Sequence, residues 1–400
     1  MSDVDRLLAA FEAGELLRPD TTEPGLVDLA RAIATIADVP DIEATDHSRA
    51  LEADIGPAEH LVFILVDGLG ASALEAEAGA SFMREHRVRQ LRSTFPSTTA
   101  VALTSLATGA WPADHGIVGW WTHLPALADA ATVLPFTRRL DDRPLQELGI
   151  EATDAFPLPS LWQRATRDTA CVQPERIAGS TYSAYALGGR ACMPYRSLRE
   201  AFDAVISHVE DAGDPSYTYL YLPHVDGAAH EYGLNSPEVH GAITAIDREL
   251  ARCAETLQGA ARIVLTSDHG HLEAPPEHRH PIRNDDALGS RLACLPSGDL
   301  RCAVFHVRPG QTEDFAAAFR LRFGERFALL TAAEVEELRL LGPAPLSEET
   351  RRRLGDFMAI SLGADILAYV TAGGDRHALH QPSHHSGMRP EEVLIPLVLA

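Results

Sequence analysis

Three short, mostly hydrophobic runs along the chain are rich in β-branched and aromatic residues. They are Leu61–Val66, Tyr217–Leu222 and Arg262–Ser267. Each run is long enough for one strand and is followed by turn-forming or acidic residues, a pattern typical of strands buried on both faces of a sheet. Two later segments of similar character, Cys302–Val307 and the C-terminal Glu391–Ala400, predict further strands.

Helical patterns separate these runs. Apolar positions recur at helical spacing in Ala100–Thr108, Leu198–Asp211 and Ser236–Leu257. Strands that alternate with helices predict an α/β fold with a mostly parallel central sheet flanked by helices. Ligands of such sheets bind beyond the carboxyl ends of the strands, so the residues that follow each predicted strand are the first candidates for chemistry.

The chain is long enough for one large α/β domain with an insertion. Residues 1–57 have the pattern of short amphipathic helices, and we expect them to pack on the core as an N-terminal lead-in. Residues 58–400 are predicted to form the main domain. Within it, residues 122–200 are irregular and rich in proline, arginine and small residues, which predicts a cap insertion.

The charge of the chain limits its partners. The formal net charge is −23, and all 34 basic residues are arginine because the sequence contains no lysine. Binding a nucleic acid polymer along its backbone needs a cationic surface, so the composition argues against such a partner. If the substrate is a phosphate ester, positive charge must come from bound metal and a few arginines.

The cysteines and the N-terminus predict a cytoplasmic protein that has no membrane partner. The five cysteines are scattered and form no C-x-x-C pair, which is typical of free thiols in a reducing compartment. The first residues lack the basic and apolar regions of a secretory signal. No stretch is apolar for long enough to span a membrane.

Acidic residues and histidines follow the three main predicted strands. Asp67 comes directly after the first strand, Asp226 and His230 follow the second, and Asp268 and His269 follow the third. Because the carboxyl ends of parallel strands meet at one edge of the sheet, these side chains should lie close together. Nitrogen and oxygen ligands without cysteine fit zinc, with manganese or iron as alternatives.

A hydroxyl cluster, Ser97-Thr98-Thr99, stands directly before a predicted helix. Free backbone N–H groups at a helix start bind anions, and a hydroxyl placed there can attack phosphorus. A histidine-rich stretch, HALHQPSHHSG, occupies residues 377–387. Together these segments predict two zinc ions roughly 3.5–4 Å apart, the arrangement of two-metal hydrolases.

Four ordered motifs carry a resemblance to a known family: VDGLG, TFPSTTAVALTSLATGAWPADHGIVG, HVDGAAHEYG and TSDHGH, and a late histidine-rich segment continues into HSGMRPEE. The sequence from about Leu61 to the C-terminus resembles the alkaline phosphatase superfamily. Within it, the sequence is similar to the nucleotide pyrophosphatase/phosphodiesterase branch and the related phosphonoacetate hydrolases. The resemblance implies an alkaline-phosphatase-like α/β fold with two zinc ions at the carboxyl edge of its sheet.

The resemblance also implies roles for seven residues. The ligands of one zinc would be Asp67, Asp268, His269 and the nucleophile Thr99, and those of the other zinc would be Asp226, His230 and His385. In the family the attacking threonine lies three residues after a proline and nine before a Thr-Gly pair, which selects Thr99 over Thr98. Gly387 and the following Pro-Glu-Glu run select His385 over His384.

The implied function is zinc-dependent hydrolysis of phosphate diesters or nucleotide pyrophosphates through a covalent phospho-threonine. A phosphonoacetate-type phosphonate hydrolase and a phosphomonoesterase are alternatives on the same site. A non-enzymatic metal-binding protein is disfavoured, because none of the expected ligands is missing. Trp120 and Trp121 either stack on a flat leaving group or pack in the core. The substrate would be a small phosphate ester, nucleotide or phosphonate, and the sequence leaves open whether the chain is a homodimer.

Overall fold

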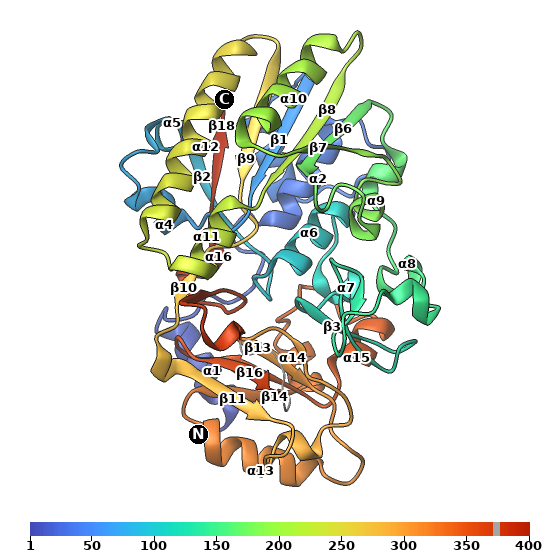
Figure 1. Cartoon of the computed structure of the whole chain (residues 1–400), viewed down its shortest axis with the longest axis vertical. Coiled ribbons are helices and arrows are strands. Elements are labelled where there is room, and N and C mark those ends of the chain that lie inside the picture. Colours follow the sequence, from blue (N-terminus) through green and yellow to red (C-terminus); the bar gives the residue numbers. More distant parts are fainter. Residues whose placement is uncertain (371–376) are drawn as a thin grey trace.

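The computed structural model describes residues 1–370 and 377–400, and its main sheet has seven strands, seen in the upper half of Figure 1. Neighbouring strands are parallel except β18, which is antiparallel to both its neighbours. The predicted α/β fold with a mostly parallel sheet is thereby confirmed. In sheet order the strands are β2 (Arg87–Arg92), β18 (Leu394–Leu399), β9 (Ala261–Thr266), β1 (His60–Val66), β8 (Ser216–Leu222), β6 (Asp168–Pro174) and β7 (Cys192–Tyr195).

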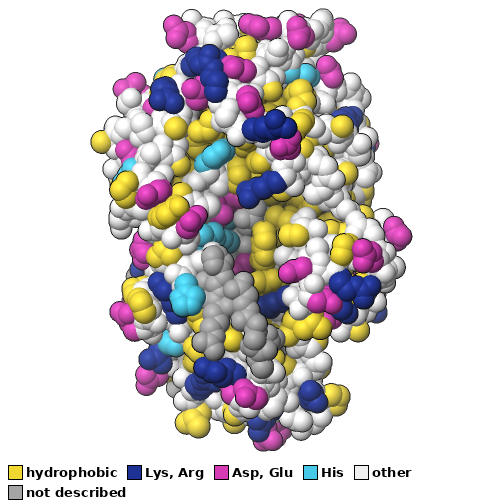
Figure 2. All heavy atoms as spheres, viewed as in Figure 1, with side chains coloured by type: hydrophobic (Ala, Val, Ile, Leu, Met, Phe, Trp, Pro, Cys, Tyr) yellow, Lys and Arg dark blue, Asp and Glu magenta, His cyan; other side chains and the backbone are white. Residues whose placement is uncertain are grey.

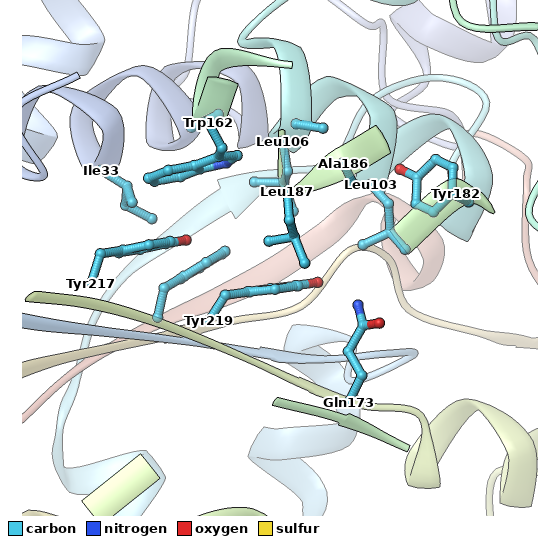
Figure 3. Close-up of a pocket in the computed structure, with 13 residues that line it drawn as sticks. Ile33, Leu103, Leu106, Trp162, Gln173, Tyr182, Ala186, Leu187, Tyr217 and Tyr219 are labelled. Carbon is cyan, nitrogen blue, oxygen red and sulfur yellow. The ribbon is translucent and has the colours of Figure 1, made fainter. Parts of the chain in front are cut away.

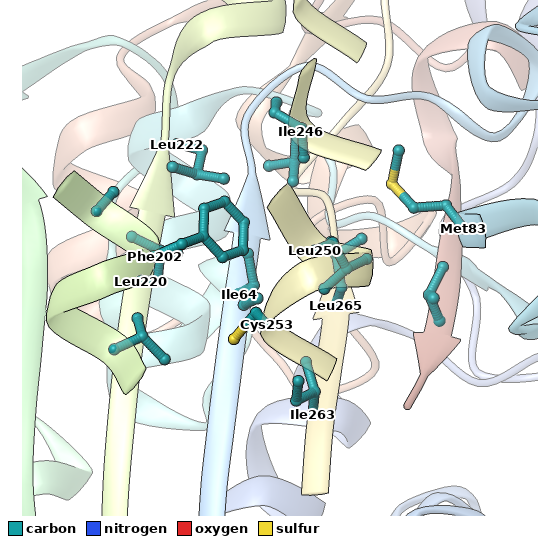
Figure 4. Close-up of a cluster of buried hydrophobic side chains, with 14 of the residues drawn as sticks. Ile64, Met83, Phe202, Leu220, Leu222, Ile246, Leu250, Cys253, Ile263 and Leu265 are labelled. Carbon is teal, nitrogen blue, oxygen red and sulfur yellow. The ribbon is translucent and has the colours of Figure 1, made fainter. Parts of the chain in front are cut away.

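Both faces of the main sheet are covered by helices. Side chains alternate along β1, so Ile64 points to one face and Phe63 to the other. Figure 4 shows the first face, where Phe202 and Leu250 lie beside Ile64. Each large apolar side chain buried in this way stabilises the fold by about 1.5–3 kcal/mol before entropy is counted. The covering helices are α10 (Leu198–Asp211) and α12 (Pro237–Thr256) on the first face, and α2 (Leu26–Ile36), α3 (Asp46–Ile55) and α6 (Thr99–Thr108) on the second.

A second seven-stranded sheet, entirely antiparallel, lies below the first in Figure 1. The sequence did not predict it, because all of its strands are only two to five residues long and show little alternation. Its strands in order are β14 (Phe327–Thr331), β15 (Phe357–Ser361), β13 (Cys302–Phe305), β12 (Ser297–Gly298), β3 (Trp121–Leu124), β4 (Asp129–Thr132) and β5 (Thr137–Arg138). Three helices pack against this sheet: α13 (Thr312–Phe323), α14 (Ala332–Glu337) and α15 (Glu348–Leu354).

The expected cap, residues 122–200, and the expected N-terminal lead-in, residues 1–57, each contain elements that join or pack on both sheets. Residues 122–200 contribute β3, β4 and β5 to the second sheet, but β6 and β7 to the main sheet. Of the N-terminal residues, helix α1 (Asp3–Glu12) packs on β14, whereas α2 and α3 pack on the main sheet. The range 122–200 is therefore built into both sheets.

Most expected elements match the observed ones within a few residues, but the C-terminal strand begins later than predicted. Residues Pro390–Val393 form a short helix, α16, before β18 starts. Pro390 occupies the first helical position, and the Glu392 side chain accepts the N–H of Arg389, so the local sequence favours a helical turn. The expected strand from Glu391 was wrong for these residues.

Shorter elements complete the chain. Two small ribbons pair β10 (Leu272–Glu273) with β17 (Ser383–His384) and β11 (Arg279–Arg283) with β16 (Ile366–Val370). The remaining α-helices are α4 (Ala71–Ala76), α5 (Ser81–Glu85), α7 (Pro112–His115), α8 (Ala152–Ala155), α9 (Thr181–Ala186) and α11 (His224–Tyr232). Of the helices in the described ranges, none combines the length and apolar character needed to cross a membrane.

Candidate metal centre and active site

The three strand-end carboxylates converge at the carboxyl edge of the main sheet. Asp67 follows β1, Asp226 lies in the first turn of α11 directly after β8, and Asp268 follows β9. The backbone N–H of Asp226 donates to the carbonyl of Asp67 at 3.0 Å, which ties the two strand ends together. The parallel register of β8, β1 and β9 therefore produces the juxtaposition that the sequence predicted.

Gly68 allows this close approach. Its φ is +76°, and a Cβ at this position would lie 2.8 Å from the Cα of Asp226. Any other residue would force apart the turn that holds Asp67 and Asp226.

Asp67, Asp268 and His269 form a fully buried group with ligand atoms within 4.8 Å of one another. His269 Nε2 lies 3.4 Å from Asp67 Oδ1 and 3.4 Å from Asp268 Oδ2. Thr99 Oγ1 lies 3.2 Å from the same nitrogen. Four potential ligand atoms from three segments of the chain thus face one another.

Each of the two carboxylates has one oxygen held and one oxygen free. Asp67 Oδ2 accepts from the hydroxyl of Tyr221, and Asp268 Oδ1 accepts from the N–H groups of Gly68 (3.1 Å) and His269 (3.0 Å). Asp67 Oδ1 and Asp268 Oδ2 are buried without a hydrogen-bond partner. Unpaired buried carboxylate oxygens are costly, so this arrangement fits a divalent cation bound between them.

Three histidines present the same ring nitrogen to the centre. In each, Nδ1 lies near a backbone carbonyl oxygen, which can only accept, so Nδ1 carries the proton and Nε2 keeps its lone pair. Metal-binding imidazoles are commonly held by such a bond. The three contacts are His230 to Ser383 (3.0 Å), His269 to Gly270 (3.0 Å) and His385 to Ser97 (3.1 Å).

Asp226 joins two further groups of potential ligands. One contains Asp226, His230 and His271, and the other contains Asp226, His269 and His385. The predicted set of Asp226, His230 and His385 is therefore split, although Nε2 of His230 and of His385 lie 3.4 and 3.8 Å from Asp226 Oδ1.

The sequence reasoning missed His271. Its Nε2 lies 2.9 Å from Asp226 Oδ1, and its Nδ1 lies 3.2 Å from the hydroxyl of Ser383. The only available signal was its position in the motif TSDHGH, two residues after His269. In the structure it is the histidine nearest to the Asp226 carboxylate.

The electrostatics of the centre also favour a bound cation. Burial, reinforced by the charges of Asp268 and Asp226, raises the pKa of Asp67 well above its usual value. Burial, with His269 close by, lowers the pKa of His385 well below its usual value. Metal ligands must be deprotonated carboxylates and neutral imidazoles, so His385 is already in its metal-binding form, and the carboxylates repel one another until a cation is present.

Thr99 is the one hydroxyl of its cluster that faces this centre. Ser97 Oγ donates to the carbonyl of Gly387 at 2.8 Å, and Thr98 Oγ1 donates to Asp299 Oδ2 at 2.8 Å. Thr98 is the N-cap of α6, so Thr99 is the first residue of the helix. The hydroxyl of Thr99, and not that of Thr98, is therefore the one next to His269.

A family model for type I phosphodiesterase/nucleotide pyrophosphatase matches residues 61–362. The chain belongs to this family. Membership indicates a phosphoester hydrolase, and the family fold implies the use of divalent metal. No curated protein sequence matches the chain.

Solved structures share the fold of this phosphodiesterase-family chain at low sequence identity. Murine ectonucleotide pyrophosphatase/phosphodiesterase 5 is 17% identical with a TM-score of 0.63, over 84% of this chain and 87% of that one. The human protein of the same name is 17% identical with a TM-score of 0.64, over 85% of this chain and 87% of that one. Phosphonoacetate hydrolase from Sinorhizobium meliloti 1021, in complex with phosphonoformate, is 20% identical with a TM-score of 0.61, over 85% of this chain and 89% of that one.

The backbone next to His385 is held in an unusual conformation. Ser386 has a φ of +92°, a conformation that favours glycine. Glu392 accepts from the N–H of Gly387 at 2.8 Å and pairs with the fully buried Arg301 at 2.7 Å. This pair links the Pro-Glu-Glu run to the turn that carries His385.

We predict that His385→Ala weakens metal binding strongly and that His384→Ala does not. His385 belongs to one of the ligand groups, whereas His384 belongs to none of those in the described ranges. His384 is a suitable control for His385, because it is the adjacent residue and is also buried. Its Nε2 has no hydrogen-bond partner, and the centroid of its ring lies 5.8 Å from that of His230. Metal content after dialysis, measured for both variants, decides; loss of metal in His384→Ala alone would show that the register is wrong by one residue.

Tyr221 is expected to position Asp67. Burial, together with the charge of Asp67, raises the pKa of Tyr221 well above its usual value, so its hydroxyl stays protonated and donates. Tyr221→Phe should weaken metal binding by about tenfold or more, as is typical when a residue that orients a ligand is lost. Tyr219→Phe, on the same strand, is the control and should leave the metal affinity unchanged. Equal affinities in both variants and the wild type would contradict this role.

The tryptophans and a pocket rich in aromatic side chains lie outside the ligand groups. The Arg139 guanidinium stacks 3.6 Å above the ring of Trp121, and Trp120 packs against a hydrophobic cluster, so both have structural partners. The pocket in Figure 3 lies against α6 and is lined by Trp162, Tyr217 and other mostly apolar side chains, together with the polar Gln173. It contains no carboxylate or histidine, so it does not fit the metal chemistry.

On the face shown in Figure 2, histidine side chains gather in a hollow near the middle of the molecule.

Proposed function

We propose that the chain is a zinc-dependent hydrolase of phosphate diesters or nucleotide pyrophosphates that forms a covalent phosphate ester on Thr99. One observation carries the proposal: Thr99 Oγ1 meets His269 Nε2 at the point where two carboxylate oxygens are buried without partners. A ligand set of nitrogen and oxygen fits zinc, and manganese or iron would use the same donors.

Two ions would be held by neighbouring sets of residues. The first set is Asp67, Asp268, His269 and Thr99, and the second is Asp226, His230 and His385, with His271 beside Asp226. Bound there, two divalent ions would polarise the Thr99 hydroxyl and neutralise charge on the attacking and leaving oxygens.

The protein contributes the nucleophile and the orientation of the phosphate. Thr99 and Ala100 lie in the first turn of α6, where backbone N–H groups have no helical partner and can bind phosphate oxygens. Thr99 Oγ1 attacks phosphorus, and the bond to the leaving group breaks as the new P–O bond forms. The leaving group takes up the proton that the Thr99 hydroxyl loses. Water then attacks the phosphorus bound to Thr99, which releases the remaining phosphate monoester and restores the hydroxyl.

The absence of lysine and the pairing of Arg92 and Arg301 with carboxylates favour diesters over monoesters as substrates. A monoester carries a second negative charge that needs a positive partner, and the chain has no lysine. Arg92, the arginine nearest to Thr99 in sequence, is paired with Asp20 at 2.9 Å. Arg301 is buried and paired with Glu392.

Phosphonate hydrolysis is the second candidate. Among the similar structures, phosphonoacetate hydrolase has been solved with phosphonoacetate and with phosphonoformate, and inactive murine ectonucleotide pyrophosphatase/phosphodiesterase 5 has been solved with AMP. All these ligands are small anions that contain phosphorus, so they support a small phosphate ester, nucleotide or phosphonate as the substrate.

Rates on three substrates distinguish these activities. The kcat/KM of one zinc-loaded preparation is measured with an aryl phosphate diester, the matching monoester and phosphonoacetate. We expect the diester to give the highest value. A higher value for the monoester would contradict the charge argument, and a higher value for phosphonoacetate would favour the second candidate.

A cytoplasmic location remains part of the proposal. All five cysteines are free in the structure, which is typical of a reducing compartment.

A further inference from the structure

A second cluster of metal-ligating side chains lies in the part of the molecule that contains the antiparallel sheet. His123 lies on β3, His306 directly follows β13, and Cys294 lies in the loop between residues 291 and 297. Each offers a ligand atom within 4.8 Å of the other two, and all three side chains are half-buried. The cluster shares no residue with the groups around His269 and Asp226, and it is the only such group with a sulfur ligand in the described ranges.

The separations fit a shared ion. Cys294 Sγ lies 3.7 Å from His123 Nδ1. Tetrahedral zinc with Zn–S of about 2.3 Å and Zn–N of about 2.0–2.1 Å places sulfur and nitrogen about 3.6 Å apart. The rings of His123 and His306 have centroids 3.9 Å apart and are tilted by 31°, so the imidazoles already lie next to each other.

The three positions are fixed by the backbone. The N–H of Ala293 donates to the carbonyl of His306 at 2.8 Å, and Leu292 bridges to Val307, so the loop with Cys294 is attached to the end of β13. His306 Nε2 lies 3.3 Å from the carbonyl oxygen of Arg353, which leaves Nδ1 with the lone pair. A backbone contact of this kind commonly orients a metal-binding histidine.

The protonation states suit a metal better than a nucleophile. Burial, with His306 nearby, lowers the pKa of His123 to about 4, and burial also lowers the pKa of His306. Both rings are therefore neutral at neutral pH. Burial raises the pKa of the Cys294 thiol to about 12, so the thiolate does not form by itself and a Cys-His nucleophile pair is disfavoured.

The surrounding charges nearly balance. Electrostatic interactions reach Cys294 from Asp129 and Arg139, His123 from Arg353, and His306 from Asp356. The two carboxylates and two guanidinium groups leave no large net charge that would repel a cation.

We propose that His123, Cys294 and His306 form a further metal site that binds Zn²⁺ through two imidazole nitrogens and one thiolate, separate from the catalytic centre. On binding, the Cys294 S–H bond breaks, a Zn–S bond forms with the electron pair of sulfur, and one proton is released to solvent. Three protein ligands leave the fourth position of a tetrahedral ion to water. A mixed nitrogen and sulfur set is typical of zinc among the common divalent ions.

Cobalt substitution tests this site separately from the catalytic centre. The catalytic groups contain no cysteine, so thiolate-to-Co²⁺ charge-transfer absorption reports only a sulfur ligand. Metal-free protein titrated with Co²⁺ should develop this absorption, and added Zn²⁺ should abolish it. Cys294→Ser should lack it, whereas the control Cys192→Ser should keep it. Absence of the band in the wild type, or its persistence in Cys294→Ser, overturns the proposal.

A second measurement needs no variant. Zn²⁺ should protect Cys294 of the wild-type protein from alkylation, as followed by mass spectrometry of its peptide. Cys192, which is also half-buried, provides the internal control and should react at the same rate with and without metal. Equal alkylation of Cys294 in both conditions contradicts the site, even if Cys294→Ser does not fold.

Discussion

Thr99→Ala should lower kcat by roughly a thousandfold or more, because removal of a nucleophile leaves only direct attack by water. The fold should be retained. Thr98, and not Thr99, is the N-cap of α6, and α6 is held by packing against the main sheet. Both metal ions should also remain, because Asp67, Asp268 and His269 still provide three ligand atoms. Steady-state rates and metal content of the purified variant test both statements.

Two neighbouring variants provide the controls. Thr99→Ser retains a hydroxyl at the same position and should keep appreciable activity. Thr98→Ala removes a hydroxyl that is already bonded to Asp299 and should have a mild effect. Full activity in Thr99→Ala, or a larger loss in Thr98→Ala, would show that the attacking hydroxyl has been misassigned.

Asp268→Asn should have opposite effects on metal binding and on the stability of the metal-free protein. Metal affinity and turnover should fall by more than the roughly ten- to a hundredfold typical of residues that only orient a ligand, because Asp268 Oδ2 faces the centre directly. The metal-free protein should melt at a higher temperature. One of the mutually repelling carboxylates is gone, and the new amide can donate to the unpaired Asp67 Oδ1.

Asp247→Asn is the matched control for this effect. Asp247 is also buried and accepts backbone N–H groups from Phe82 (3.2 Å) and Met83 (2.7 Å), but it lies outside the ligand groups. This variant should keep its metals and should not gain stability. If the metal-free Asp268→Asn protein has a melting temperature no higher than that of the metal-free wild type, repulsion between these carboxylates does not destabilise the metal-free protein, and the prediction is wrong.

The sequence predicted the central strands of the main sheet and the grouping of the strand-end carboxylates because both follow from simple patterns, but it did not predict β2, β6 or β7. Continuous hydrophobic runs identified β1, β8 and β9, and parallel strands bring their carboxyl ends to one edge. Asp67, Asp226 and Asp268 therefore had to lie near one another once the strands were placed. The spacing from Pro96 to Thr99 needed the family pattern in addition.

Other features depend on contacts between distant segments. The second sheet could not be predicted because strands such as β12, with two residues, carry no recognisable pattern. His271 was overlooked because its role depends on the orientation of Asp226, 45 residues away. The group formed by His123, Cys294 and His306 spans more than 180 residues of sequence, so no local motif identifies it.

The identity of the attacking group can be measured directly. A substrate labelled on phosphorus is mixed rapidly with the zinc-loaded enzyme, the reaction is quenched with acid, and the digested protein is searched for labelled peptide. We expect a labelled phosphate ester on Thr99, in a peptide that also contains Ser97 and Thr98, with the modified residue assigned by fragmentation. Label on Ser97 or Thr98, or turnover with no labelled peptide at any quench time, would contradict it.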